Sequence, residues 1–190
     1  ESPGPSVSRL APTVRSTAKI LYTIYLLMTV LEIVILLLCG MPVFDALTTA
    51  FGTAGTGGFG IKNDSMGGYS VAIQIVVTVF MILFGINFNV FYLIAIKKFK
   101  EAFKCEEMRW YLVIIALSIG LITINITSMY HSVAKAFRFA SFQVASIITT
   151  TGYATADFDK WPLLSKTIIV LLMFVGACAG STGGGMKVSR

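Results

Sequence analysis

Charged side chains are scarce in this 190-residue sequence: Asp, Glu, Lys and Arg make up 13% of it, whereas 56% of the residues are hydrophobic. A soluble domain carries about 25% charged and about 45–50% apolar residues, so the charge here is too sparse to solvate a globular surface. The net charge of +6 could suggest a nucleic-acid binder, but the basic residues flank apolar runs and form no polar patch. The composition excludes nucleic acid as a partner, a disordered chain and a collagen-like fibre, and it favours a membrane protein.

Histidine and cysteine are also rare. The single histidine, His131, has no second ligand or nucleophile near it in the sequence, and no Ser/His/Asp set, metal-ligand cluster or pair of acids suggests an active site. Three cysteines without short spacing favour a packing role over a disulfide framework or a metal site; they are Cys39, Cys105 and Cys178. We therefore expect no enzyme activity and no organic cofactor.

Long uncharged runs are present instead. A helix that crosses a hydrocarbon core of ~30 Å needs about 20 mostly apolar residues. Four stretches meet this length, namely residues 20–39, 71–96, 110–129 and 161–179. The first contains one acid, Glu32, and the last contains Lys166 near its outer end. We expect four membrane spans, with the second continuing as an uninterrupted helix through residues 85–89.

The basic residues predict the orientation of these spans. Ten of the fifteen lie before the first span, between the second and third, or after the fourth: Arg9, Arg15, Lys19, Lys97, Lys98, Lys100, Lys104, Arg109, Lys187 and Arg190. The positive-inside rule then places both termini and the linker in the cytoplasm, and the short segments between paired spans outside. Because residues 1–5 are polar and no initiator Met is present, we expect no signal peptide and a start inside a longer protein.

The two halves of the sequence resemble each other at an offset of 95 residues. The pairs are Phe44 with Phe139, Ala50 with Ala145, Thr56-Gly57 with Thr151-Gly152, and Gly85 with Gly180. Each half therefore consists of a span, a short outside segment and a second span. Because each unit crosses the membrane an even number of times, both copies have the same orientation. This parallel repeat contradicts a secondary transporter built from inverted repeats.

The short outside segments, residues 42–53 and 132–150, are helix-compatible, and each leads into a Thr/Gly stretch. Glycine admits the positive φ that turns successive carbonyls inward, where they replace the hydration shell of a cation. The negative C-terminal end of each short helix favours that cation further. Flexible extracellular turns are the alternative, which two copies in register disfavour. The candidate filter residues are Gly55, Thr56, Gly57, Gly58, Thr150, Thr151, Gly152 and Tyr153.

These segments resemble the filters of the Trk/Ktr/HKT superfamily of potassium transporters, most closely its bacterial Trk branch. The resemblance rests on residues 44–59, 145–158 and 179–188, and it covers nearly the whole chain. It implies an all-α membrane protein in which four membrane–pore-loop–membrane repeats surround one pore. This chain resembles the second repeat (20–96) and most of the third (110–190), joined by a cytoplasmic linker (97–109) and preceded by a cytoplasmic lead-in (1–19).

The resemblance implies K⁺ uptake across the bacterial cytoplasmic (inner) membrane, with K⁺ held at the filter carbonyls. Glycine at both filter positions, Gly57 and Gly152, favours K⁺. A Na⁺-permeable relative and a non-conducting pore-loop scaffold are the alternatives. The resemblance also implies contact with membrane lipid, a homodimer, and a cytosolic nucleotide-binding regulatory subunit of the RCK type.

The resemblance assigns a gate to the glycine-rich run that follows the fourth span. In the family this break forms an intramembrane loop beneath the filter, and three consecutive glycines cannot hold a rigid helix. The gate residues are Gly180, Ser181, Thr182, Gly183, Gly184 and Gly185. A phosphate-binding loop fails on spacing, because Met186 separates the last glycine from Lys187 and Val188 stands where Ser or Thr is needed.

Five further polar residues each allow two interpretations. Glu32, the only acid inside a span, either coordinates a cation or pairs with a Lys or Arg of a repeat outside this chain. Asn87 and Asn89 either form hydrogen bonds between helices or line the pore. Asp157 and Asp159 either raise the cation concentration at the filter mouth or form a solvated turn with the lysine that follows them.

Overall fold

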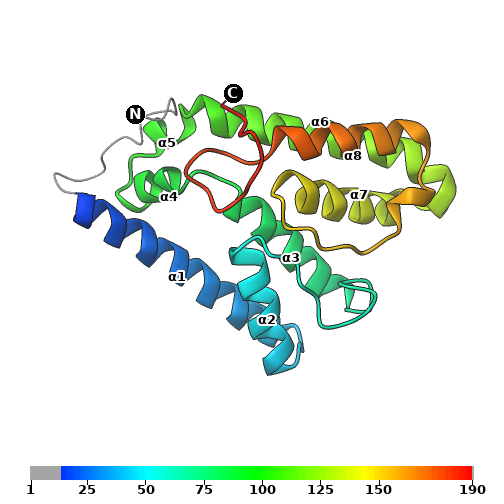
Figure 1. Cartoon of the computed structure of the whole chain (residues 1–190), viewed down its shortest axis with the longest axis horizontal. Helices are drawn as coiled ribbons and strands as arrows, with labels where there is room; N and C mark the ends of the chain where they lie inside the picture. The colour runs from blue at the N-terminus through cyan, green and yellow to red at the C-terminus, as the bar shows by residue number, and fades with distance from the viewer. Residues whose placement is uncertain (1–13, 190) are drawn as a thin grey trace.

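The computed structural model describes residues 14–189, and within this range every regular element is helical (Figure 1). The predicted all-α class is therefore confirmed. Arg9 and Arg190, two of the residues used to predict orientation, lie outside the described residues. The elements are α1 (Val14–Leu38), α2 (Val43–Ala54), α3 (Val71–Phe84), α4 (Phe88–Ala95), α5 (Phe99–Phe103), α6 (Glu106–Tyr130), α7 (Val133–Ile148), the 3₁₀ turn η1 (Phe158–Lys160) and α8 (Leu163–Val175).

Helices α1 and α6 are long and apolar enough to cross a membrane. Their candidate spans, Arg15–Leu38 and Glu106–Tyr130, contain 24 and 25 residues, which at 1.5 Å per residue corresponds to about 36–38 Å. Both helices begin several residues before the predicted spans, so they extend into the segments predicted as lead-in and linker. The first and third predicted spans are thus single helices.

The prediction of an uninterrupted helix over residues 71–96 is wrong. Helices α3 and α4 meet at a bend of 93°. The bend is stabilised from outside the segment, because the Tyr111 hydroxyl of α6 donates a hydrogen bond of 3.1 Å to the Ile82 carbonyl. A Cβ on Gly85 would overlap that hydroxyl, so glycine is required where the chain turns. Asn87 then caps α4, with its Oδ1 accepting the N–H of Asn89 at 2.9 Å.

Helix α8 is shorter than the span predicted over residues 161–179. It has 13 residues, or about 20 Å, and is too short to cross a bilayer alone. It ends at Val175 because Gly176 adopts a φ of +73° and the glycine-rich run that follows does not continue the helix.

The predicted repeat is visible in the order of elements. Each half contains a long helix, a short helix, a loop and a second apolar helix, as α1–α2–loop–α3 and α6–α7–loop–α8. The short helices α2 and α7 match the predicted segments within two residues at each end. In Figure 1, α2 lies against α1 and α3, whereas α7 lies among α3, α6 and α8.

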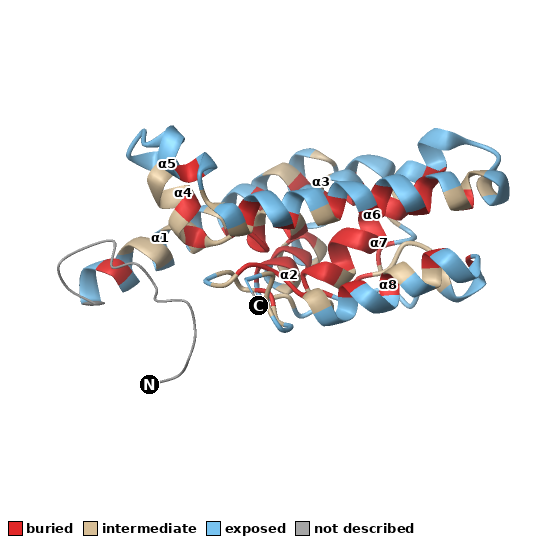
Figure 2. Cartoon of the chain, turned by 90° about the horizontal axis from the view of Figure 1, so that it is seen from above, coloured by how far each residue is buried: buried red, intermediate tan, exposed pale blue. Residues whose placement is uncertain are grey.

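The buried residues lie between the packed helices, both within each half and where α3 meets α7 (Figure 2), and the outward faces of the long helices are exposed. On α1, Leu27 is 64% exposed and Leu38 is 82% exposed. A helix with such a face is stable only when lipid or further protein covers it, because exposed apolar surface of this extent is unfavourable in water. The fold is therefore that of a multi-pass membrane protein.

Candidate functional site

The loops that follow α2 and α7 have the same backbone conformation. Each contains a threonine in the left-handed region and, two residues later, a glycine with positive φ. In the first loop these are Thr56 (φ 51°) and Gly58 (φ 66°), and in the second Thr150 (φ 61°) and Gly152 (φ 89°). A β-branched residue rarely adopts positive φ, so its recurrence in both loops shows that the two are equivalent structures.

Hydrogen bonds close the two loops in the same way, and they correct the predicted pairing. The N–H of Gly57 donates to the Gly52 carbonyl at 2.8 Å, and the N–H of Thr151 donates to the Ser146 carbonyl at 2.9 Å. Gly57 thus corresponds to Thr151, and the residue after it corresponds to Gly152. The predicted pairing of Gly57 with Gly152 is wrong by one residue. Thr and Gly recur at short intervals here, so the predicted offset and the offset one residue shorter both pair identical residues. Only the backbone conformation distinguishes the two offsets.

The two loops lie side by side. A Cβ on Gly58 would overlap the carbonyl oxygen of Thr151, so the backbones touch at a position where only glycine fits. Further along, the N–H of Met66 donates to the Ala154 carbonyl at 2.9 Å, and the N–H of Ala154 donates to Ser65 Oγ at 3.2 Å. The predicted filter residues of the two repeats are therefore brought together.

Tyr153 anchors the second loop to the first repeat. Its side chain is fully buried, and its hydroxyl donates to the Thr49 carbonyl of α2 at 3.2 Å. Gly52 provides the space, because a Cβ there would overlap the Tyr153 hydroxyl. The Tyr153 carbonyl accepts a hydrogen bond of 2.6 Å from Ser146 Oγ, which directs it toward α7. Tyr153, predicted as a filter residue, therefore has a carbonyl that is already hydrogen-bonded to α7 and a side chain that anchors the loop. The anchoring was not predicted, although a large aromatic directly after a glycine of the loop was an available signal.

The glycine-rich run contacts both loops. Thr56 Oγ1 donates to the Thr182 carbonyl at 3.3 Å, and the N–H of Gly184 donates to Thr150 Oγ1 at 2.7 Å. A Cβ on Gly183 would lie 3.1 Å from the Thr149 carbonyl oxygen, which leaves little room for a side chain. The predicted gate residues thus meet the predicted filter residues at the C-terminal ends of α2 and α7, where the helix dipoles are negative.

The same run docks onto the bend between α3 and α4. The N–H of Cys178 donates to the Gly85 carbonyl at 3.1 Å, and the N–H of Phe88 donates to the Gly180 carbonyl at 3.1 Å. A Cβ on Gly180 would lie 3.0 Å from the side-chain oxygen of Asn87, so this asparagine lies at the contact. The helix break of one repeat and the glycine-rich break of the next therefore form one connected unit, which sequence reasoning missed.

Glu32 is enclosed within this chain. It has no exposed surface, and its carboxyl group lies next to Thr53 of α2. Neither carboxyl oxygen has a hydrogen-bond partner among the described residues. Pairing with a lysine or arginine of another repeat would require an exposed face, so that hypothesis is wrong.

The loop between α2 and α3 is tied back to the start of α2. The Tyr69 hydroxyl donates to Asp45 Oδ2 at 2.7 Å, and Lys62 Nζ lies 4.0 Å from the centre of the Tyr69 ring. Burial, and then the neighbouring Asp45 carboxylate, raise the pKa of Tyr69 to about 12. The phenol therefore stays protonated and keeps donating this hydrogen bond throughout the physiological pH range.

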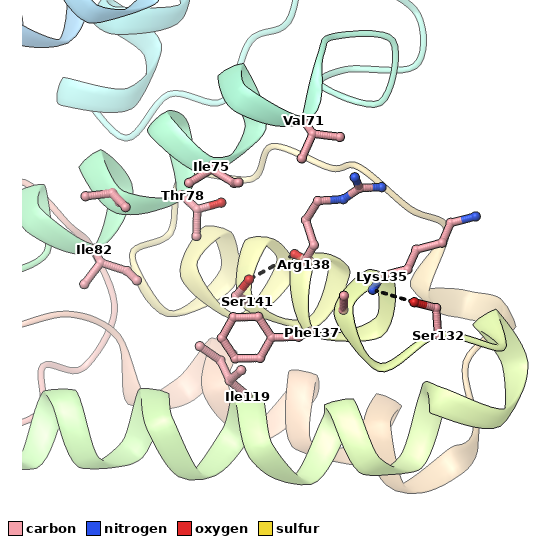
Figure 3. A pocket seen from close by; sticks show the side chains of 12 residues that line it. Val71, Ile75, Thr78, Ile82, Ile119, Ser132, Lys135, Phe137, Arg138 and Ser141 are labelled. Carbon is pink, nitrogen blue, oxygen red and sulfur yellow. Dashed lines mark hydrogen bonds between the residues drawn. The ribbon is translucent and has the colours of Figure 1, made fainter.

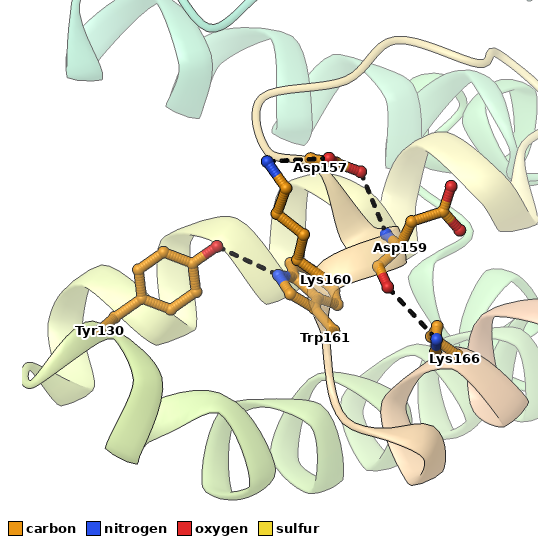
Figure 4. A network of polar contacts seen from close by, with 6 residues as sticks. All are labelled: Tyr130, Asp157, Asp159, Lys160, Trp161 and Lys166. Atoms are coloured by element: carbon orange, nitrogen blue, oxygen red, sulfur yellow. Dashed lines mark hydrogen bonds and ion pairs between the residues drawn. The ribbon is translucent and has the colours of Figure 1, made fainter.

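Polar contacts hold the turn beyond the second loop (Figure 4). Asp157 Oδ2 lies 3.3 Å from Lys160 Nζ, and Asp157 Oδ1 accepts the N–H of Asp159 at 3.2 Å. The indole N–H of Trp161 donates to the Tyr130 hydroxyl of α6 at 3.0 Å, which fixes the start of the following segment. The predicted solvated turn with a lysine is confirmed, and a role of these acids in concentrating cations stays a prediction.

The oxygen atoms at the site come mainly from the backbone and from threonine. Within residues 14–189, no group of three or more His, Cys, Asp or Glu could hold a metal ion, and Cys39, Cys105 and Cys178 are free thiols. Carbonyl and hydroxyl oxygens in adjacent loops are the ligands with which proteins replace the hydration shell of an alkali cation. The arrangement therefore suits the binding of an alkali cation.

Comparison with known proteins agrees with this geometry. The family described as TrkH, cation transport protein, matches residues 8–190. The Trk system potassium uptake protein TrkH of Vibrio parahaemolyticus is 37% identical over 198 residues, covering 100% of this chain and 41% of that protein. The protein of the same name from Salmonella typhimurium is 34% identical over 195 residues, covering 100% and 40%.

A solved structure shows the same fold. The crystal structure of the potassium transporter TrkH from Vibrio parahaemolyticus superimposes with a TM-score of 0.86 at 36% identity, covering 97% of this chain and 41% of that one. The chain spans about two fifths of the length of the curated relatives that it matches.

Proposed function

The chain belongs to the TrkH family of cation transport proteins, and from this we propose that it forms the second repeat and most of the third repeat of a K⁺-translocating membrane subunit. The relatives that it matches over its whole length are named potassium uptake proteins. The observation that carries the proposal is the pair of equivalent loops in backbone contact, with the glycine-rich run hydrogen-bonded to both.

In this proposal the two loops supply two of the four strands of a selectivity filter. Carbonyl oxygens of residues 55–58 and 150–152 replace water around a dehydrating K⁺, and two further repeats complete the ring. The equivalent left-handed threonines and glycines support this role, because equivalent strands must present their carbonyls at equivalent heights. The C-terminal ends of α2 and α7 add negative potential below the filter.

The glycine-rich run is the proposed gate. In this proposal it lies where an ion leaving the filter at the C-terminal ends of α2 and α7 would pass, and hydrogen bonds join it to both loops and to the bend between α3 and α4. Glycine imposes little steric restriction on the backbone, so the segment is able to change conformation once these bonds break. Opening requires the bonds to Thr56 and Thr150 to break.

The setting of the subunit follows from family membership and from the distribution of charge. We propose the bacterial inner membrane, with the termini and the linker of residues 97–109 in the cytoplasm and the filter mouth outside. A homodimer and a cytosolic nucleotide-binding regulatory subunit of the RCK type complete the proposal. No residue of this chain identifies either partner, so both rest on the family alone.

Replacing Gly152 by Ser in the full-length protein tests the filter. A Cβ at Gly152 meets nothing within 4 Å, so the change acts through the backbone φ of +89° and the position of the carbonyls. In proteoliposomes we expect the ratio of K⁺ to Na⁺ flux to fall about tenfold or more, equivalent to about 1.4 kcal/mol of discrimination.

Gly40→Ser is the matched control. Gly40 has a φ of +84° and also meets nothing within 4 Å, yet it lies in the turn between α1 and α2, away from the filter. It should carry the same backbone strain and leave selectivity unchanged. Unaltered selectivity in Gly152→Ser, or an equal loss in both variants, would argue against a filter role for this loop, and absence of flux in the wild-type protein would argue for a scaffold that does not conduct.

A further inference from the structure

A cavity of about 710 Å³ opens between α3 on one side and α6 and α7 on the other (Figure 3). Its walls are mostly apolar: Val71, Ile75, Val79, Ile82, Ile119 and Phe137. Several of these side chains are half exposed although large, including Ile75 at 51% and Phe137 at 55%. The volume lies within the range of about 300–1,000 Å³ that is typical of small-molecule sites.

Two cations line one end of this cavity. Lys135 and Arg138 are three residues apart on α7 and therefore lie on the same face of the helix. Figure 3 shows Arg138 extending from α7 toward Val71, at the beginning of α3. No ion pair within residues 14–189 includes either side chain, and no Asp or Glu lines the cavity. The Arg138 Nε is buried and has no hydrogen-bond partner within the same range.

The cavity is thus charged at one end and apolar along its length. From Val71 to Ile82 the wall formed by α3 extends about 16 Å at 1.5 Å per residue. A ligand that fits this shape has a compact anionic group joined to a long apolar chain. Anionic phospholipid has such an anionic group and apolar chains, and it is present in the bilayer around a membrane-spanning protein.

We propose that this groove binds one anionic phospholipid. Its phosphate lies between Lys135 and Arg138, and one acyl chain lies along α3 against Ile75 and Val79. Lys135 Nζ lies 5.9 Å from the centre of the Tyr130 ring and Arg138 Cζ lies 4.9 Å from that of Phe139, but neither has an acidic partner within residues 14–189. A zwitterionic lipid would bring its own cation to the same place, so two basic residues without an acidic partner favour a headgroup with net negative charge. Because α7 leads into the second filter loop, the bound lipid would hold the start of this helix against α3.

The test uses the full-length protein in a neutral detergent with defined lipid. Native mass spectrometry would count bound lipid, and thermal unfolding would measure stabilisation by phosphatidylglycerol and by phosphatidylcholine. Each basic residue near an anionic lipid strengthens binding about fivefold. The double variant Lys135→Gln/Arg138→Gln should therefore bind phosphatidylglycerol about thirtyfold more weakly, and its thermal shift should approach that given by phosphatidylcholine.

Two further variants separate the parts of the proposal. Lys160→Gln removes a cation that lies in the turn beyond the second loop and outside the groove, and it should leave lipid binding unchanged. Val79→Trp places a larger side chain in the groove beside its apolar wall. It should lower lipid retention although Lys135 and Arg138 are still present. Unfolding midpoints in detergent without phosphatidylglycerol would show that each variant folds.

Four results would overturn the proposal. They are unchanged retention of phosphatidylglycerol in the double variant, equal stabilisation by phosphatidylcholine, an equal shift from glycerol phosphate without acyl chains, and unchanged retention in Val79→Trp. The last would also be expected if another segment of the full-length chain fills the groove. These outcomes do not depend on ion flux, so they are distinct from failure of the proposed transport function.

Discussion

At the scale of single residues, the contact of Tyr153 with Gly52 shows how one repeat positions the filter of the next. The hydroxyl of Tyr153 reaches the Thr49 carbonyl on α2 only because residue 52 has no side chain. The glycine-rich character of the first loop was evident from its sequence. The need for glycine at position 52, in the last turn of α2 before this loop, was not, since it arises from a tyrosine about one hundred residues later in the chain.

Gly52→Ala should lower the stability of the full-length protein by about 1–3 kcal/mol, because the added methyl group overlaps the Tyr153 hydroxyl. Tyr153→Phe should lower it by about 1 kcal/mol through loss of one hydrogen bond. The double variant removes the overlapping oxygen, so it should lose less than the sum of the two. Thermal unfolding in detergent measures all three.

Gly120→Ala is the control for this cycle, because a Cβ at this position of α6 meets nothing within 4 Å. Alanine should be neutral or stabilising there by up to about 1 kcal/mol. If the stability losses of Gly52→Ala and Tyr153→Phe were strictly additive, residues 52 and 153 would not be in contact.

Glu32 is another residue that the sequence singled out, as an acid inside a span, without showing that the protein encloses its side chain. A buried carboxylate without a partner is strongly unfavourable, so Glu32→Gln, which keeps the shape and removes the acid, should leave stability unchanged or raise it. Glu32→Ala should lose about 2–4 kcal/mol through the cavity left beside Thr53. Denaturation midpoints compare the two; a large loss in Glu32→Gln would show that the ionised carboxylate itself is required.

At the scale of elements, the short helices and the glycine-rich break were predictable, and the bend between α3 and α4 was not. Pro42 directly precedes α2, and Ser132 Oγ accepts the N–H of Lys135 to cap α7, so local chemistry marks both starts. No proline marks the bend between α3 and α4 in the sequence. It depends on Tyr111 and on the glycine-rich run, both distant in sequence, and an apolar run alone cannot reveal such tertiary partners.

The contact between the glycine-rich run and the second loop gives a prediction about gating. Thr150→Val keeps the β-branched shape but removes the oxygen that accepts the Gly184 N–H at 2.7 Å. We expect higher K⁺ flux under conditions in which the wild-type protein is closed, with a loss of stability of about 1 kcal/mol. K⁺ flux into proteoliposomes that contain only the full-length protein measures this.

Thr127→Val serves as its control, since the Thr127 hydroxyl donates only to the Thr123 carbonyl within α6. Basal flux should be unchanged there. Equal flux in Thr150→Val and wild type would mean that this hydrogen bond does not hold the loop closed.

At the scale of the whole molecule, residues 14–189 have two proposed filter strands and large apolar faces that nothing in this range covers. The repeated order of elements and the all-helical class were both predictable, because hydrophobic runs and loop motifs recur along the chain. The register between the loops was not, since threonine and glycine match at two offsets. Backbone hydrogen bonds settle it in favour of Gly58 as the partner of Gly152.

Residues 14–189 expressed alone and placed in liposomes should give no K⁺-selective flux, whereas the full-length protein in the same lipid should conduct. Two strands cannot surround an ion, and the exposed faces of α1 would lack their protein neighbours. Selective flux from the isolated segment would show that copies of it assemble into a complete ring.

The buried Tyr153 also has a consequence for biosynthesis. Its docking site on α2 belongs to a part of the chain that leaves the ribosome about one hundred residues earlier. Vectorial insertion would therefore present α2 to the membrane before the tyrosine that fits against it emerges. The order of repeats in the polypeptide then becomes the order in which neighbouring parts of the pore assemble.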